Sequence, residues 1–401
     1  MASISKENWG NLYDRYKDNG KPHKILSLDG GGMRGVLTLE ILKDMEQKLK
    51  EALVDKKQLS EGDDFVLSDY FDYIGGTSTG AIIAAGLSRG MHVQQLLDFY
   101  IDKGQAMFDP VFLLNKVKYF YNEGSLLKEL KNTFGDKDID VLSGDFKTLL
   151  LVVTMNRTTD SPWPISNNPD AKYNDRKRLD CNLRIPLYQL VRASTAAPAY
   201  FKPETLQWDP GNPEKTFVFV DGGVTPYNNP AFLLYKMATQ APYKLGWKTG
   251  EKNLLIVSVG TGSAPSPGVY GNILSTLKNI PNNLMYTMQV DQDINCRTVG
   301  RCIYGAPIDR EMGDLIPLDE NNKVLPLEND ANRHFSYIRY NADLSQEGLT
   351  DLGLTGIDSD QVREMDSVKH IQDLQTIGKA VGTKQVDVAK HFANFLNGAS
   401  V

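Results

Sequence analysis

Short apolar runs alternate with amphipathic stretches through the first two thirds of the chain. Residues 23–28, HKILSL, form the first run and stop at an aspartate and three glycines, which predicts a strand followed by a turn. Apolar residues then recur at helical spacing, which predicts a helix from about residue 35 to residue 53. A second short strand is expected over 71–76, and a helix of small residues over 79–90.

Three further apolar runs, over residues 147–155, 216–220 and 253–262, are almost uninterrupted by polar residues. Such runs are typical of strands that are buried on both faces of a parallel sheet. Helices are expected between them, around 186–194, 229–240 and 270–289. This alternation predicts an α/β protein with three layers, α/β/α, and a central, mostly parallel sheet. Residues 1–22 are predicted to be a polar lead-in with a short helix at most, and the proline-rich stretch 160–180 a surface loop.

Composition narrows the class of protein. The formal net charge of −6 argues against general binding of nucleic acid, because such domains are usually basic. The three cysteines are scattered, odd in number and lack a C-x-x-C spacing, so we expect no disulfide framework and no zinc site, and a reducing compartment. No apolar run reaches the roughly 18 residues that span a bilayer, and residues 1–20 contain no apolar core of a signal peptide. A cytoplasmic protein with at most peripheral membrane contact is therefore predicted.

The first glycine-rich turn permits three interpretations. Gly30, Gly32 and Gly35 satisfy G-x-G-x-x-G between a strand and a helix, as in dinucleotide-binding proteins. No strand carrying an acidic residue follows about 20 residues later, and no Lys-Ser/Thr pair completes a P-loop. The glycines could equally form only a tight turn. In the third interpretation, the N–H groups at the start of the helix stabilise an oxyanion that develops during a reaction.

The second glycine-rich turn offers a nucleophile. GTSTG, residues 76–80, is a G-x-S-x-G pattern between a strand and a helix, which is the context of a nucleophile elbow. Ser78 would need a base to accept its proton. None of the four histidines that follow it stands after a strand in a glycine-rich turn, so each is expected to be a surface or packed residue. These are His92, His334, His370 and His391.

Asp221 is the better candidate for the base. It ends the apolar run FVFV and precedes two glycines, a position from which a parallel sheet presents side chains to a site at its carboxyl edge. Burial there would raise the pKa of the carboxyl group and make it a stronger proton acceptor. The alternative is that Asp221 only forms a turn at the end of its strand.

Together these segments resemble the patatin-like phospholipase family. The resemblance rests on DGGGMRG at 29–35, GTSTG at 76–80 and DGG at 221–223. RASTAAPAYFKP at 192–203, NNPA at 228–231 and SVGTG at 258–262 add weaker similarities in the family's order. The resemblance implies a patatin-like catalytic domain over 23–262. Residues 263–401 are then expected to pack on this domain or to cap it.

The resemblance also implies the chemistry, a Ser–Asp dyad without histidine that cleaves acyl esters of membrane phospholipids through an acyl-enzyme. Ser78 would attack the carbonyl carbon and Asp221 would accept the proton. The implied oxyanion loop consists of Gly30, Gly31, Gly32, Met33, Arg34 and Gly35. The implied elbow and dyad motifs add Gly76, Thr77, Thr79, Gly80, Gly222 and Gly223. No metal and no cofactor is implied.

Several expectations concern partners. Some bacterial relatives are effectors that cyclic nucleotides activate in antiviral defence, so a cyclic dinucleotide activator is considered, together with a homodimer. Residues 107–127 mix aromatic and basic residues, which suits either contact with a lipid headgroup region or an ordinary core helix. Arg34 would hold the glycine loop or meet a headgroup phosphate, and Arg297 with Arg301 could serve a phosphate. A nucleotide-binding protein, or a storage protein with incidental activity, is the alternative function.

Overall fold

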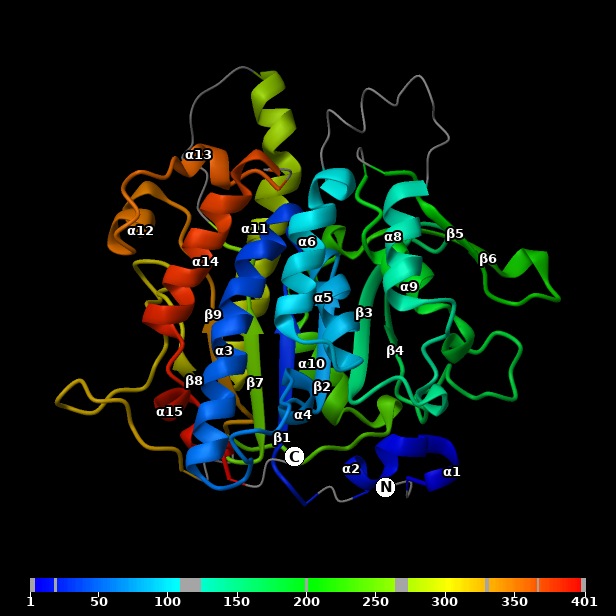
Figure 1. Cartoon of the computed structure of the whole chain (residues 1–401), viewed down its shortest axis with the longest axis horizontal. Coiled ribbons are helices and arrows are strands. Elements are labelled where there is room, and N and C mark those ends of the chain that lie inside the picture. Colours follow the sequence, from blue (N-terminus) through cyan, green and yellow to red (C-terminus); the bar gives the residue numbers. More distant parts are fainter. Residues whose placement is uncertain are drawn as a thin grey trace.

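A single sheet of nine strands organises the part of the chain that the computed structural model describes, which is residues 4–17, 20–108, 124–198, 201–263, 273–328, 332–365 and 368–397. The strand order is β5-β6-β3-β2-β1-β7-β9-β8, with β4 added alongside β3 (Figure 1). The strands are β1 (His23–Leu28), β2 (Tyr73–Thr77), β3 (Leu149–Asn156), β4 (Ser161–Ser166), β5 (Glu204–Gln207), β6 (Thr216–Asp221), β7 (Leu254–Val259), β8 (Arg301–Tyr304) and β9 (Ser336–Tyr340).

Six neighbouring strands run parallel, from β3 through β2, β1, β7 and β9 to β8. β4, β5 and β6 run antiparallel to their partners. The prediction of an α/β fold with a central, mostly parallel sheet is therefore confirmed. Because parallel strands end at the same edge, the segments that follow β1, β2 and β7 meet there.

Helices cover both faces of the sheet. On one face lie α3 (Gly35–Asp55), α5 (Thr79–Ser88), α6 (Val93–Phe108) and α14 (Ile371–Gln385), and on the other α10 (Ala231–Thr239) and α11 (Ile273–Val299) (Figure 1). The side chains of β1 point alternately into two hydrophobic cores, one on each face of the sheet. Leu26 and Leu28 pack into the first core, and Ile25 packs into the second. The remaining helices are α1 (Lys6–Trp9), α2 (Tyr13–Tyr16), α4 (Leu67–Tyr70), α8 (Gly124–Phe134), α9 (Leu187–Ser194), α12 (Gln346–Asp351), α13 (Ser359–Val362) and α15 (Val388–His391).

Two predictions about irregular segments were wrong. The stretch 160–180 was expected to be a loop, but it contains β4, which pairs with β3 from Leu151 to Asn156. Pro162 and Pro164 hid this strand, because proline lacks the N–H of the ladder and is tolerated mainly in edge strands. Within the described ranges, β4 pairs with no strand other than β3. The lead-in was expected to hold a short helix at most, but it folds into α1 and α2 and buries Trp9 and Tyr16 in the second core.

The C-terminal part of the chain contributes directly to the sheet. β8 and β9 extend it beyond β7, and α14 lies along α3. α11 continues to Val299, beyond the predicted end near residue 289. The proposed division between residues 262 and 263 stays a prediction.

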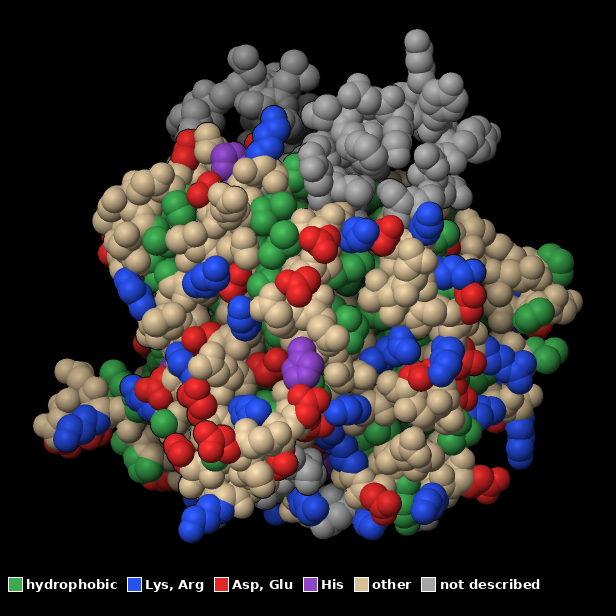
Figure 2. Space-filling model, viewed as in Figure 1, with side chains coloured by type: hydrophobic (Ala, Val, Ile, Leu, Met, Phe, Trp, Pro, Cys, Tyr) green, Lys and Arg blue, Asp and Glu red, His purple; other side chains and the backbone are tan. Residues whose placement is uncertain are grey.

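The surface in Figure 2 mixes charges of both signs, with apolar side chains between them. Part of the segment 305–328 projects from the body as a loop (Figure 1). Leu315, Leu318, Val324 and Leu325, in this segment, are exposed. Within the described ranges, no helix is both long and apolar enough to cross a membrane.

The buried lead-in gives a first test. Trp9 is fully buried, and its Nε1 donates to Asp170 Oδ2 at 2.8 Å. We expect Trp9→Ala to lower the free energy of unfolding by about 3–5 kcal/mol, because a large aromatic side chain leaves the core. Denaturant titration would measure this loss. Trp9→Phe keeps most of the ring and should cost less, whereas a loss under about 1 kcal/mol for Trp9→Ala would show that the lead-in adds little to the fold.

Candidate active site

A sharp turn between β2 and α5 exposes Ser78 at the carboxyl edge of the sheet. Ser78 has φ 55° and ψ −123°, a backbone conformation that residues other than glycine seldom adopt. It stands at the N-terminal end of α5, and the residue is 8% exposed. The predicted strand and helix on either side are both present, which is the geometry of a nucleophile elbow.

Close backbone contacts explain the two glycines of this turn. A Cβ added at Gly76 would lie 2.0 Å from the carbonyl oxygen of Gly80. A Cβ added at Gly80 would lie 2.3 Å from the carbonyl oxygen of Leu28, the last residue of β1. Neither contact can be relieved by moving a flexible side chain. The two glycines therefore allow α5 to start directly against the end of β1.

Ser194 fixes the elbow from α9. Its Oγ accepts a hydrogen bond of 2.9 Å from the N–H of Ser78 and donates to the carbonyl oxygen of Val153 at 2.7 Å. No chemical role for Ser194 was predicted from the sequence, although it lies within RASTAAPAYFKP. The Ser194 hydroxyl therefore connects the elbow backbone to β3, and it accepts the hydrogen bond of the Ser78 N–H.

Asp221, at the end of β6, faces Ser78. Ser78 Oγ donates to Asp221 Oδ2 at 2.6 Å, and the N–H of Gly223 donates to Asp221 Oδ1 at 2.7 Å. The N–H of Asp221 donates to the carbonyl oxygen of Ala196, so the residue is held at both its backbone and its side chain. Gly222 and Gly223 begin a 3₁₀ turn, Gly222–Val224. This turn brings the N–H of Gly223 within hydrogen-bonding distance of the Asp221 carboxylate.

Burial sets the electrostatics of this pair. Removal from water raises the pKa of Asp221 to about 6, and the hydrogen bonds from Ser78 and from the Gly223 N–H partly oppose this shift. A carboxylate with that pKa is still mostly ionised at neutral pH, yet it is a stronger base than an exposed aspartate. It can therefore accept the proton of Ser78.

The four later histidines bond to other groups, as the sequence predicted. His92 Nε2 lies 3.0 Å from Asp64 Oδ1, and His370 Nδ1 lies 3.0 Å from Asp373 Oδ2. His334 and His391 bond to the hydroxyl groups of Tyr235 and Tyr340. Among the residues described, no cluster of three or more histidine, cysteine or acidic side chains could hold a metal ion.

The first glycine turn lies directly beside Ser78, since a Cβ added at Gly30 would lie 3.2 Å from Ser78 Cβ. Most backbone N–H groups of residues 30–35 donate hydrogen bonds to other groups of the protein. Gly30 donates to the Asn228 carbonyl and Met33 to the Met365 carbonyl, while Arg34 and Gly35 donate within the loop. Within the described ranges, the N–H groups of Gly31 and Gly32 donate to no other group.

Two open N–H groups favour one of the three interpretations of this turn. A pyrophosphate would require many donors along the loop, but the four engaged N–H groups are not free to bind one. A single oxyanion needs only two or three donors. The geometry therefore favours a small anionic oxygen next to Ser78.

The arginines considered for phosphate binding have other partners. Arg34 Nη1 donates to the Arg363 carbonyl at 3.3 Å, and burial lowers the pKa of Arg34 to about 10. Arg297 forms an ion pair with Asp293 at 2.8 Å and donates to two carbonyl groups. Arg301 donates to the Leu325 carbonyl. Of the two roles considered for Arg34, its contact with residue 363 favours holding the loop.

Comparison with known proteins agrees with this geometry. A family model described as patatin-like phospholipase matches residues 26–235, just over half of the chain. The chain belongs to the patatin-like phospholipase family. The matched region includes the glycine loop, the elbow and Asp221, and it ends before β7, β8 and β9.

Individual relatives come from two groups of organisms. Patatin-17 of Solanum cardiophyllum is 29% identical over 60% of this chain and 60% of its own length. The cGAMP-activated phospholipase of Vibrio cholerae serotype O1 is 29% identical over 59% of this chain and 64% of its own length. A protein of the same name from Escherichia coli is 28% identical over 59% and 62%. The similarity thus spans less than two thirds of the length of each relative.

The packing of the elbow can be tested without a substrate. We expect Gly80→Ala to slow the labelling of Ser78 by a fluorophosphonate at least about tenfold, because the added Cβ meets the Leu28 carbonyl and must displace the elbow. Labelling kinetics followed by mass spectrometry would measure the effect. Gly62→Ala is the matched control, since no atom lies within 4 Å of a Cβ added there. Equal labelling rates for Gly80→Ala and wild type would contradict the packing described.

Proposed function

We propose that the protein hydrolyses fatty acyl esters of membrane phospholipids, as a phospholipase A, with Ser78 as nucleophile and Asp221 as base. The observation that carries the proposal is the 2.6 Å hydrogen bond from Ser78 Oγ to a buried carboxylate, next to a loop with open N–H groups. Membership of the patatin-like phospholipase family supports the class of substrate.

The proposed reaction begins with attack of Ser78 Oγ on the acyl carbonyl carbon. Asp221 Oδ2 accepts the hydroxyl proton, and the N–H groups of Gly31 and Gly32 donate to the oxyanion of the tetrahedral intermediate. Collapse of this intermediate breaks the ester bond, and Asp221 returns the proton to the departing lysophospholipid oxygen. Water, activated by Asp221, then hydrolyses the acyl-enzyme and releases the fatty acid.

The contribution of each oxyanion donor to the reaction rate can be measured. Removal of one oxyanion-hole hydrogen bond typically slows an acyl transfer by about 10²–10³-fold. Two backbone donors could therefore account for a large share of the rate enhancement. They also require no side chain, so the orientation of the glycine peptides alone sets their effect.

Fewer observations support the proposals of membrane contact and of activation by a cyclic dinucleotide. The stretch 107–127, considered for lipid contact, falls mostly outside the described residues. The names of two relatives, each a cGAMP-activated phospholipase, support activation of this chain by a cyclic dinucleotide. Patatin-17 is equally similar, so identity alone does not separate a regulated enzyme from a plant-type patatin. A homodimer stays a prediction.

Vesicle hydrolysis tests the dyad. Phospholipid vesicles would be incubated with each protein, with and without cyclic GMP-AMP, and released fatty acid and lysophospholipid would be quantified. We expect Ser78→Ala and Asp221→Asn each to lose roughly 10³-fold or more in rate, because the nucleophile or its base is removed. Cyclic GMP-AMP should increase release by wild type.

Ser88→Ala is the matched control for that experiment, since Ser88 is a buried serine near the other end of α5. It should keep the wild-type rate. Equal release by wild type and Ser78→Ala would remove Ser78 as nucleophile. If wild type releases no fatty acid with or without the nucleotide, the proposed activity is wrong. Release that is independent of cyclic GMP-AMP would reject its role as activator.

The raised pKa of Asp221 predicts the pH dependence. Because the base must be unprotonated, kcat/KM should fall roughly tenfold per pH unit below about 6 and reach a plateau above it. A soluble nitrophenyl ester with a leaving group that needs no protonation would give this profile. A plateau that extends down to pH 4.5 would show that the carboxylate keeps an ordinary aspartate pKa.

The same shift predicts a change in stability. Folding raises the pKa of Asp221 above its unfolded value of about 3.9, so its contribution to stability is present below pH 4 and is lost as pH rises through about 6. Asp221→Asn should therefore lose less stability than wild type between pH 4 and pH 7. Denaturant titration at both pH values provides this second, activity-independent measurement.

A further inference from the structure

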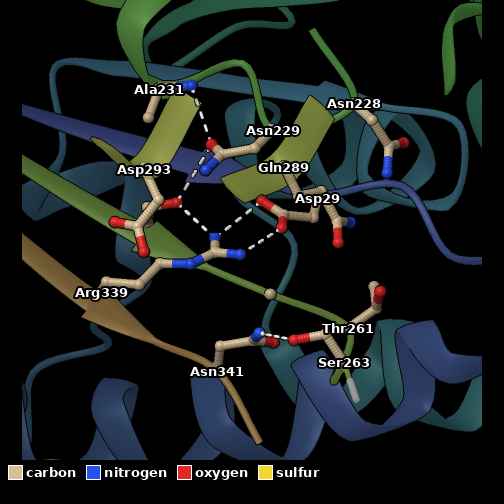
Figure 3. Close-up of polar contacts among 12 residues, drawn as sticks. Asp29, Asn228, Asn229, Ala231, Thr261, Ser263, Gln289, Asp293, Arg339 and Asn341 are labelled. Atoms are coloured by element: carbon tan, nitrogen blue, oxygen red, sulfur yellow. Dashed lines mark hydrogen bonds and ion pairs between the residues drawn. The ribbon is translucent and has the colours of Figure 1, made fainter. Parts of the chain in front are cut away.

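A buried ion pair anchors the start of the glycine loop to a distant part of the chain. Arg339 Nη1 donates to Asp29 Oδ1 at 2.9 Å, and Nη2 donates to Asp29 Oδ2 at 2.5 Å (Figure 3). The Arg339 side chain is 5% exposed and that of Asp29 is 0% exposed. Arg339 lies on β9, about one hundred residues beyond the region that the family model matches, and neither residue bonds to Ser78 or Asp221.

The guanidinium group also ties neighbouring strands together. Arg339 Nη1 donates to Ser258 Oγ on β7 at 2.6 Å, and Ser258 Oγ donates to Asn229 Oδ1 at 3.3 Å. The same Asn229 oxygen accepts from the N–H of Ala231 at 3.1 Å (Figure 3). The position of Asp29 is therefore determined by β7, β9 and the segment that begins α10.

Side-chain donors converge on the next peptide. The Gly30 carbonyl oxygen accepts from Thr261 Oγ1 at 3.1 Å, from Gln289 Nε2 at 3.4 Å and from Asn228 Nδ2 at 3.5 Å. Figure 3 labels these three side chains in the same close-up as Asp29. Gln289 comes from α11, so it too lies outside the matched region.

Planarity of the peptide bond connects these contacts to catalysis. The carbonyl group of Gly30 and the N–H of Gly31 belong to the same trans peptide, so they point in opposite directions. Donors that hold the carbonyl oxygen on one side of the loop hold the Gly31 N–H on the other. The ion pair with Arg339 also anchors Asp29, the residue from which Gly30 and this peptide extend.

We propose that Arg339, through its ion pair with Asp29, is a positioning residue that orients the Gly31 N–H toward the oxyanion. The proposal rests on the proposed function and extends it to the C-terminal part of the chain. Arg339 acts on the rate of the chemical step, because it sets the direction of a hydrogen bond that forms fully in the transition state. It does not touch the substrate, so substrate binding is unaffected.

The experiment measures kcat and KM separately, on a soluble nitrophenyl ester, for wild type, Ser78→Ala, Arg339→Met, Arg339→Lys and the double variant Asp29→Asn with Arg339→Met. Melting temperature is measured for every protein. The double variant removes both charges, so it leaves no unpaired charge in the core. Arg15→Met is the matched control, because Arg15 forms a comparable buried ion pair with Asp72, at 3.1 Å, at the amino end of β2.

We expect Arg339→Met to lower kcat about 100-fold while KM changes less than about threefold, as for loss of one oxyanion donor. Arg339→Lys should recover part of kcat, since it restores the charge without the paired geometry. The double variant should recover melting temperature but not kcat. Arg15→Met should lower melting temperature and keep kcat.

Two results would overturn the proposal alone. One is an active wild type together with a folded Arg339→Met or double variant that keeps wild-type kcat. The other is a loss of kcat that merely follows the folded fraction. If wild type does not cleave the ester, or Ser78→Ala cleaves it equally well, the proposed function fails and the positioning role fails with it.

Discussion

The contact between the start of α5 and the end of β1 is the constraint on which the site depends. Because Gly80 meets the carbonyl oxygen of Leu28, α5 can begin only where β1 ends. At this contact Ser78 has its positive φ, and the loop that follows Leu28 lies next to the Ser78 side chain. Ser78 and the glycine loop are thus brought together where the start of α5 approaches the end of β1, a contact that neither segment could form alone.

The two halves of the site are held by different parts of the chain. Ser78 and Asp221 bond to each other and to Ser194, Ala196 and Gly223, all within the region shared with the family. The glycine loop bonds to Asn228 within that region, but it also bonds to later residues, among them Gln289, Arg339 and the Met365 carbonyl. Residues beyond the matched region therefore take part in holding the loop. In the proposed reaction this separates the nucleophile from the groups that stabilise its transition state.

Local sequence predicted the elements whose causes are local. The glycines after an apolar run and the serine between two glycines predict their turns directly from the sequence. This works because a sharp turn restricts both the backbone and the neighbouring side chains. Asp221 could also be predicted from its place at a strand end. Arg339, in YIRYN, carries no such signal, since its importance comes from a partner 310 positions away. Ser194 was missed for the same reason, and β4 because its prolines mask a strand that only the fold supports.

Burial explains how a carboxylate could replace a histidine as base. An exposed aspartate is too weak a base at neutral pH, whereas a fully desolvated one would be protonated and unable to accept a proton. Asp221 lies between these limits, because burial raises its pKa while the Gly223 N–H and Ser78 Oγ stabilise the charge. The number of hydrogen bonds to this carboxylate is therefore as important as its burial. A third donor would weaken the base, and loss of the Gly223 N–H would favour the protonated acid.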